Sequence, residues 1–166
     1  MTDFTEDVLR RLQDLLVLLP AGSETQSAML THDDQLFIFE TAGLLISSGN
    51  FDAERKRLLM HNLVSAVLDK YMLLLEELIC LTGSPQGCTR VEAEAKHKRR
   101  ELLAQCLSHA MSAVAWASKA FCNAQTIKSS GCLSVFLNAL EIFLRAIQVL
   151  LLNQLIHNHF HFQFQL

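Results

Sequence analysis

The stretch DDQLFIFETAGLLISSGNFDAERKRLLM, from Asp33 to Met60, decides the fold. Its two halves have helical patterns, and a short break at Ser47–Asn50 separates them. Thr31 with Asp34 three residues later has the spacing of a capping box, and acidic residues suit the positive end of a helix. Gly49 is a suitable stop, and Asp52 a suitable cap for the next helix. The stretch therefore predicts a pair of helices.

Further helical segments follow on both sides of this stretch. Apolar residues recur at spacings of three and four, which predicts helices over residues 5–19, 33–48, 52–81, 91–121 and 132–158. The chain has 166 residues, of which two are proline and six are glycine, and this scarcity favours long helices. No stretch alternates with period two except the last few residues. The predicted fold class is all-α.

The predicted helices form pairs along the chain. Residues 5–19 pair with 33–48, residues 52–81 pair with 91–121, and residues 132–158 are left without a mate. The first two pairs start about 45 to 50 residues apart, close to the roughly 40–47 residues of HEAT and armadillo units. Such units bury their apolar faces only by stacking. The sequence therefore predicts an α-α superhelix of HEAT/ARM-like repeats, as a short solenoid fragment.

The segment 132–158 is apolar nearly all round. Its polar residues Asn138, Glu141, Arg145 and Gln148 form one narrow stripe, so this helix is expected to have partners on most sides. The segment is apolar enough to span a membrane. Because Glu141 and Arg145 would lie near the bilayer centre, we predict no membrane insertion.

Catalytic and cofactor motifs are absent from the sequence. There is no P-loop, GxSxG, HExxH or dinucleotide fingerprint. The adjacent carboxylates Asp33–Asp34 and Glu76–Glu77 diverge by about 100° around a helix, so neither pair converges on one substrate atom. We therefore predict a protein that is not an enzyme, with no catalytic residues and no cofactor.

Metal binding is not predicted either. The five cysteines include no CxxC pair and are interpreted as reduced core thiols, Cys122 and Cys132 included. The alternating His157, His159 and His161 would share one face of a strand, but we expect a frayed, unstructured tail there.

The net charge of −3 argues against a global basic footprint for nucleic acid. The basic run from Lys96 to Arg100 could contact phosphate or act as a nuclear localisation signal. Glu92 and Glu94 precede Lys96 and Lys98 by four residues, which favours a solvated helix start instead. For Trp116, core packing is favoured over base stacking.

Three segments carry a family resemblance. LRRLQDLLVLLP (residues 9–20), DDQLFIFETAGLLISSGNFDAERKRLLMHNL (33–63) and SKAFCNAQTIKSSGCLSVFL (118–137) resemble consecutive segments of the exportin-T family, the tRNA exportins among the karyopherin-β proteins. The resemblance implies a HEAT-repeat superhelix that wraps tRNA cooperatively with Ran-GTP and carries it through nuclear pore components. Shuttling between nucleus and cytoplasm is then expected. Because members of this family are several times longer, the chain is expected to be a fragment that is not competent alone.

Two parts of the chain depart from the family pattern. The segment 82–101 is longer and more basic than the family's linker, and the resemblance fades after about Leu144. We therefore expect HEAT-like repeats over residues 1–146, with an unmatched insert at about 82–101, and an unmatched tail over residues 147–166.

Candidate tRNA contacts must lie inside the matched segments. By charge these are Lys119, Lys128, Arg55 and Lys56, and ordinary surface roles for them remain open. The alternative function is a short α-solenoid that binds a protein partner and has no RNA cargo.

Overall fold

The protein is built from helices joined by short turns. The structure is a computed structural model that describes residues 6–11, 31–82 and 89–163, with side chains described as far as residue 153. No strand occurs within these ranges, so the predicted all-α class is confirmed. The long helices are α2 (His32–Ser48), α3 (Ala53–Thr82), α4 (Arg90–Ser118) and α6 (Leu133–Gln163). A 3-10 turn, η1 (Lys119–Phe121), and the short α5 (Ala124–Ser129) connect α4 to α6. Residues 6–11 are also helical, and the remainder of the helix predicted over 5–19 lies outside the described residues.

The ends of α2 are those that the sequence predicts. Thr31 Oγ1 accepts a hydrogen bond from Asp34 N at 3.2 Å, and Thr31 N donates to Asp34 Oδ2 at 2.8 Å. At the other end, the Gly49 amide donates to the Leu45 carbonyl at 3.0 Å. Asp52 Oδ1 then accepts from Arg55 N at 2.7 Å and starts α3. The reversal between α2 and α3 is thus fixed by local hydrogen bonds.

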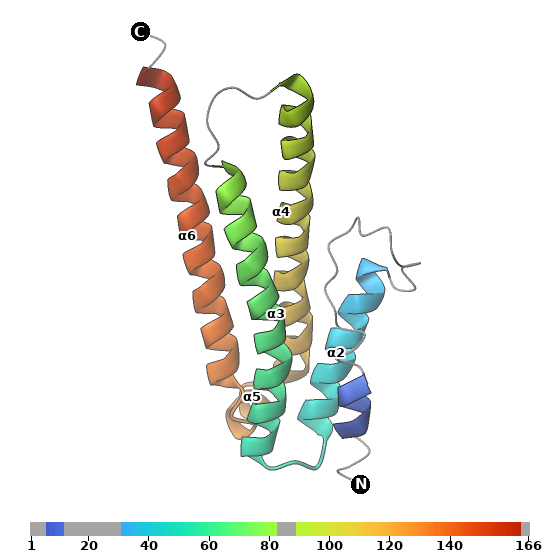
Figure 1. Cartoon of the computed structure of the whole chain (residues 1–166). Helices are drawn as coiled ribbons and strands as arrows, with labels where there is room; N and C mark the ends of the chain where they lie inside the picture. Colours follow the sequence, from blue (N-terminus) through green and yellow to red (C-terminus); the bar gives the residue numbers. More distant parts are fainter. Residues whose placement is uncertain (1–5, 12–30, 83–88, 164–166) are drawn as a thin grey trace.

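The long helices form an open array in which α4 packs between α2 and α3, and α3 packs between α4 and α6 (Figure 1). The consecutive helices α3 and α4 are antiparallel and share one of the two largest interfaces. The other large interface joins α2 to α4, and α3 also stacks on α6. The four long helices therefore alternate between two layers along the chain. One layer holds α2 and α4, and the other holds α3 and α6. This is the stacking of HEAT-type helix pairs, and the pairing predicted for residues 52–81 and 91–121 is confirmed.

Small residues bring α2 and α4 together. Ala110, Ala113 and Ala117 in the alanine-rich second half of α4 are fully buried. A Cβ added to Gly43 of α2 would lie 2.3 Å from the Ala117 carbonyl oxygen, so the two backbones are almost in contact there. Phe39, one turn before Gly43 on α2, is 1% exposed. The α2–α4 interface is thus a dry and closely packed core.

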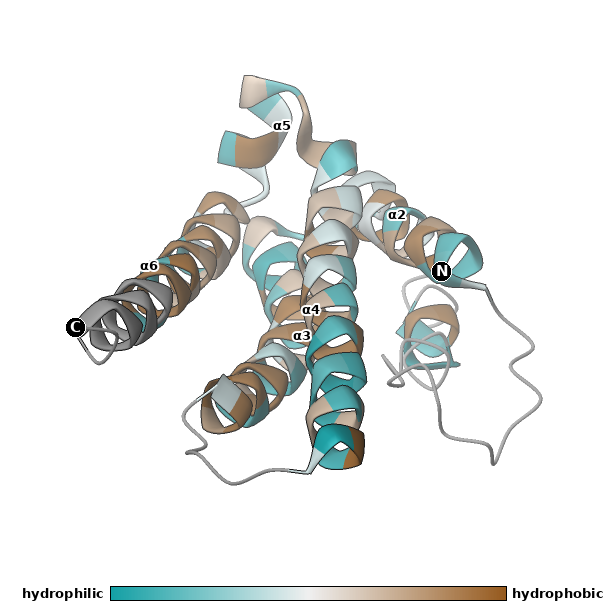
Figure 2. Ribbon diagram, turned by 90° about the horizontal axis from the view of Figure 1, so that it is seen from above, coloured by the Kyte–Doolittle hydropathy of each residue, from teal (hydrophilic) through white to brown (hydrophobic). Residues whose placement is uncertain are grey.

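The second layer joins α3 to α6 through larger side chains. Tyr71 of α3, which is 2% exposed, meets Phe143 of α6 edge-on with ring centroids 4.9 Å apart. Burial raises the pKa of the Tyr71 hydroxyl. Most of α6 away from this contact is apolar and brown in Figure 2, whereas the first turns of α4 are mostly hydrophilic. By length and composition alone, Leu133–Asn153 could cross a membrane.

Two predictions from the sequence are wrong. Cys106 and Cys132 are buried, as expected, but Cys80 and Cys122 are exposed. Cys80 lies on the outer side of α3, and Cys122 follows η1 where the chain leaves the core. The tail expected to be unstructured is helical as far as Gln163, because neither glycine nor proline interrupts α6 after Gly131. The boundary expected at residues 146–147 therefore lies within one helix, and Arg90–Arg100 of the unmatched insert form the first turns of α4.

Candidate nucleic-acid interface

The four residues predicted to contact tRNA lie at one end of the array, which we call the connector end. It consists of the α2–α3 turn (residues 49–52), the first turn of α3, η1, and α5 with the turn that follows (Figure 1). Gly131, which has the left-handed φ of +68°, sits beside Ala53 and Arg57 of α3. This contact brings the connector after α4 next to the start of α3. Arg55, Lys56, Lys119 and Lys128 thus come from separate segments to the same end of the molecule.

Arg55 is engaged in a bidentate ion pair. Its Nη2 lies 2.7 Å from Glu6 Oε2, and its Nε donates to Glu6 Oε1 at 2.9 Å. These hydrogen bonds lower the pKa of Glu6 and raise the pKa of Arg55. The pair joins the helical residues 6–11 to α3, so Arg55 has a structural role.

Lys56 donates a hydrogen bond to the backbone of α2. Its Nζ donates to the Ser47 carbonyl at 2.7 Å, close to the C-terminus of α2. A cation at this position satisfies a terminal carbonyl and complements the negative end of the helix dipole. Contact with phosphate would require Lys56 to leave this hydrogen bond.

Lys119 lies over an aromatic ring. Its Nζ is 3.0 Å from the centre of the Trp116 ring and 3.4 Å from Glu40 Oε2. Phe37 meets the same indole edge-on, with centroids 5.3 Å apart. Trp116 is half-buried and packs against the core, as predicted, and the lysine covers part of its exposed surface.

Lys128 differs from the other three candidates. It lies on α5 and is exposed. Among the side chains that the structure describes, as far as residue 153, no hydrogen bond or ion pair engages its ammonium group. It is therefore the candidate whose charge a phosphate could meet without breaking a described contact.

Acidic side chains balance much of the positive charge at the connector end. Glu6 and Glu40 pair with Arg55 and Lys119, and Glu54 pairs with Arg57, whose Nε lies 3.2 Å from Glu54 Oε2. An isolated surface of this kind gives weak phosphate affinity, since few counterions would be released on binding.

The basic run from Lys96 to Arg100 lies at the opposite end of α4. Arg99 makes a bidentate pair with Glu77 at 2.7 and 2.9 Å, and Arg100 donates to the Leu81 carbonyl at 2.7 Å. Lys98 lies 3.4 Å from Glu94 one turn earlier, as the i,i+4 spacing predicts. Arg99 and Arg100 therefore bind α4 to the end of α3. The sequence did not predict these contacts, because Arg99 and Glu77 are 22 residues apart along the chain.

One residue of each adjacent acidic pair has a structural partner as well. Asp34 caps α2, and Glu77 binds Arg99. Among the residues that the structure describes, no group of three or more histidine, cysteine, aspartate or glutamate side chains could hold a metal ion. The side chains of His157, His159 and His161 lie outside the described part.

Paired helices stacked in two layers, with charged connectors gathered at one end, define the class: a short α-solenoid of HEAT type. Comparison with known proteins then identifies the relatives. Over 147 residues, 89% of the chain, the sequence is 43% identical to exportin-T of Homo sapiens, 44% identical to that of Danio rerio and 39% identical to that of Mus musculus. The predicted resemblance to exportin-T is confirmed as a match to part of that protein. The chain spans 14% of the length of these relatives. No family model matches the chain, and no solved structure matches it.

Proposed function

We propose that this chain forms one segment of an exportin-T-type receptor that carries tRNA out of the nucleus. The observation behind this proposal is the 39–44% identity to exportin-T over 147 residues. The open stack of helix pairs supports it, because a solenoid of this kind presents a long surface rather than an enclosed active site.

In this proposal the receptor binds tRNA together with Ran-GTP, interacts with pore components and shuttles between nucleus and cytoplasm. The chain hydrolyses nothing and acts as a binding surface. Ligand affinity in a repeat array is the sum of many contacts, and each unit adds a small increment. A segment that is 14% as long as its relatives therefore binds weakly and does not carry cargo alone.

The connector end supplies the proposed tRNA contacts. Lys128 is the first candidate because its ammonium group is exposed and engages no described residue. Lys119, Arg55 and Lys56 rank lower because each already has a partner within the fold. All four would contact phosphate and would give affinity without reading base sequence.

Binding to labelled RNA tests the proposal. We expect the chain to bind folded tRNA more tightly than an unstructured RNA of equal length, with an affinity that falls as salt rises. Lys128→Glu should weaken tRNA binding several-fold and reduce the salt dependence, since a phosphate contact is lost. Lys98→Glu is the matched control, because Lys98 is an exposed lysine at the opposite end of the array, and it should change little.

An alternative function is a protein-binding α-solenoid without RNA cargo. The observation that favours it is the set of exposed leucines along α6. Equal binding of both RNAs, or none, would support this alternative. A loss of tRNA binding in Lys98→Glu but not in Lys128→Glu would move the RNA contact to the basic run.

A further inference from the structure

Trp116, the only tryptophan in the sequence, lies one turn before the connector end with a lysine over its ring. The Lys119 ammonium is 3.0 Å from the ring centre and is held on the other side by Glu40 Oε2 at 3.4 Å. Phe37 of α2, which is 58% exposed, meets the indole edge-on. We call these four residues the aromatic site. It is built where α2 packs on the last turns of α4.

The lysine that covers the ring can leave, whereas the ring itself is fixed. The side chains of Lys119 and Glu40 are 46% and 31% exposed, and both an exposed ion pair and an exposed cation–π contact are weak. A phosphate can therefore compete for the ammonium group. Trp116 is packed against the core, so its indole keeps its place when the lysine turns away. The ring face under Lys119 then becomes accessible.

We propose that Trp116 stacks on an unpaired base of the tRNA, and that Lys119 moves from the ring to a phosphate beside that base. This inference rests on the proposed function, because it names one contact within the tRNA interface. Folded RNAs present unpaired bases in loops and at their ends, and aromatic side chains stack on such bases with little preference for their identity. In the free protein, the ammonium of Lys119 lies over the ring where the base would lie.

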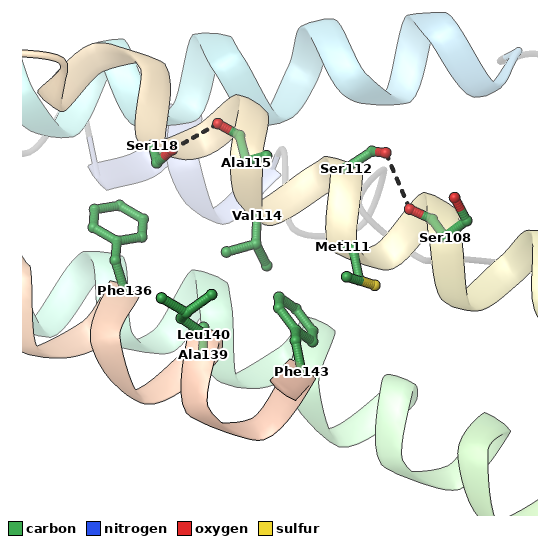
Figure 3. A pocket seen from close by; sticks show the side chains of 10 residues that line it. All are labelled: Ser108, Met111, Ser112, Val114, Ala115, Ser118, Phe136, Ala139, Leu140 and Phe143. Atoms are coloured by element: carbon green, nitrogen blue, oxygen red, sulfur yellow. Dashed lines mark hydrogen bonds between the residues drawn. The ribbon is translucent and has the colours of Figure 1, made fainter. Parts of the chain in front are cut away.

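The groove on the α6 side of α4 has a different character. Its volume is about 470 Å³, and Phe136, Leu140 and Phe143 line its α6 wall (Figure 3). On the α4 wall, Ser112 and Ser118 donate to carbonyls of their own helix. None of the described residues that line the groove is charged, and the next helices of the proposed receptor would cover it. The aromatic site, which has a cation beside its ring, is therefore the place for a nucleotide.

The fluorescence of Trp116 tests the proposal, because no other tryptophan contributes to the emission. Titration of the full chain with tRNA should quench this emission in parallel with the binding curve obtained from the anisotropy of labelled tRNA. Trp116→Leu should weaken tRNA binding about fivefold or more, and Trp116→Phe should retain most of the affinity because it keeps an aromatic face. Phe136→Leu is the matched control, since it removes another half-buried ring, and it should leave the affinity unchanged.

Glu40→Gln tests the movement of Lys119. The substitution removes the carboxylate that holds the ammonium group in the free protein, so tRNA should bind several-fold more tightly. Glu94→Gln is the matched control, because Glu94 pairs with Lys98 at the same 3.4 Å separation near the other end of α4. It makes the same change in net charge and should alter the affinity less. Equal gains in the two variants would overturn the proposed movement.

The outcomes separate this inference from the proposed function. Binding of tRNA without quenching of Trp116 would overturn the stacking and leave the proposed function in place, and this measurement on the unchanged chain does not depend on the folding of any variant. Equal affinities of Trp116→Leu and Phe136→Leu for tRNA would overturn the stacking as well. A chain that binds no tRNA would contradict both.

Discussion

Two helical surfaces of this molecule carry similar sequence patterns, but one is buried and the other is exposed to solvent. The face of α2 that carries Phe39, Ala42 and Ile46 is at most 1% exposed, because α4 covers it. The outer face of α6 carries a row of apolar residues that is as regular, which we call the leucine stripe, yet its members remain 40–54% exposed: Leu133, Leu137, Leu140, Leu144, Ile147 and Leu151. The difference lies in the neighbours, because α4 supplies small residues to α2 and no described helix lies over the stripe.

This comparison shows where stability resides in a stacked-helix protein. An apolar row stabilises the fold only when another element removes it from water. The free energy of unfolding should therefore respond strongly to substitutions in the α2–α4 interface and hardly at all to substitutions on the outer face of α6.

The largest expected effect is at the centre of the covered interface. Phe39→Ala removes a fully buried ring and should lower the free energy of unfolding by about 3–5 kcal/mol. Phe37→Ala is the control, because Phe37 lies two residues away and is 58% exposed. Denaturant unfolding followed by circular dichroism would measure both, and equal losses would contradict the assignment of the buried face.

Gly43→Ala tests the closest approach of α2 and α4. Alanine favours helix by about 1 kcal/mol, but its Cβ would lie 2.3 Å from a backbone oxygen, so the helices must separate. The net result should be a loss of about 1–3 kcal/mol in the free energy of unfolding. Thr41→Ala, on the exposed side of the same helix, should change the stability by less than about 0.5 kcal/mol. A stabilised Gly43→Ala variant would show that the backbones are further apart.

The same interface should weaken in mild acid. His109 Nε2 lies 2.9 Å from Gln35 Oε1, and its ring stacks on His32 with centroids 4.2 Å apart. Burial lowers the pKa of His109, and His32 adds to this effect while Asp33 opposes it. The unfolded chain therefore binds the proton more readily, so stability is complete above the ordinary histidine pKa of about 6.5 and falls as the pH drops below it. His109→Gln should flatten this part of the stability–pH curve, and His61→Gln, which changes an exposed histidine, should not.

The smallest expected effect is on the uncovered face. Leu144→Gln should change the stability of the monomer by less than about 0.5 kcal/mol, since the side chain is already 52% exposed. A loss comparable to that of Phe39→Ala would mean that another part of the chain covers the stripe.

Local signals in the sequence predicted much of the fold. Thr31, Asp34, Gly49 and Asp52 set the ends of α2 and α3, because capping depends on residues within three or four positions. The alanines of α4 leave room for a close neighbour, and Gly43 of α2 lies there. The exposure of Cys122 and the long continuation of α6 were missed, since the first depends on the path of a connector and the second on the absence of a stop.

The candidate interface was less predictable, because charge in a sequence does not reveal its partners. Arg55 and Lys119 have the composition of phosphate contacts, yet Glu6 and Glu40 reach them from 49 and 79 residues away. Only the folded arrangement distinguishes Lys128, whose ammonium group engages no described residue, from these paired cations.

The separation of α2 and α6 tests the open array most directly. Spin labels at position 41 of α2 and position 138 of α6, in a background with Cys80, Cys88 and Cys122 replaced by serine, would report it by electron–electron double resonance. Two intervening helices at about 9 Å spacing predict a label separation on the order of 25 Å or more. A separation below about 15 Å would mean that the four long helices close into a bundle, which would contradict the stacked array.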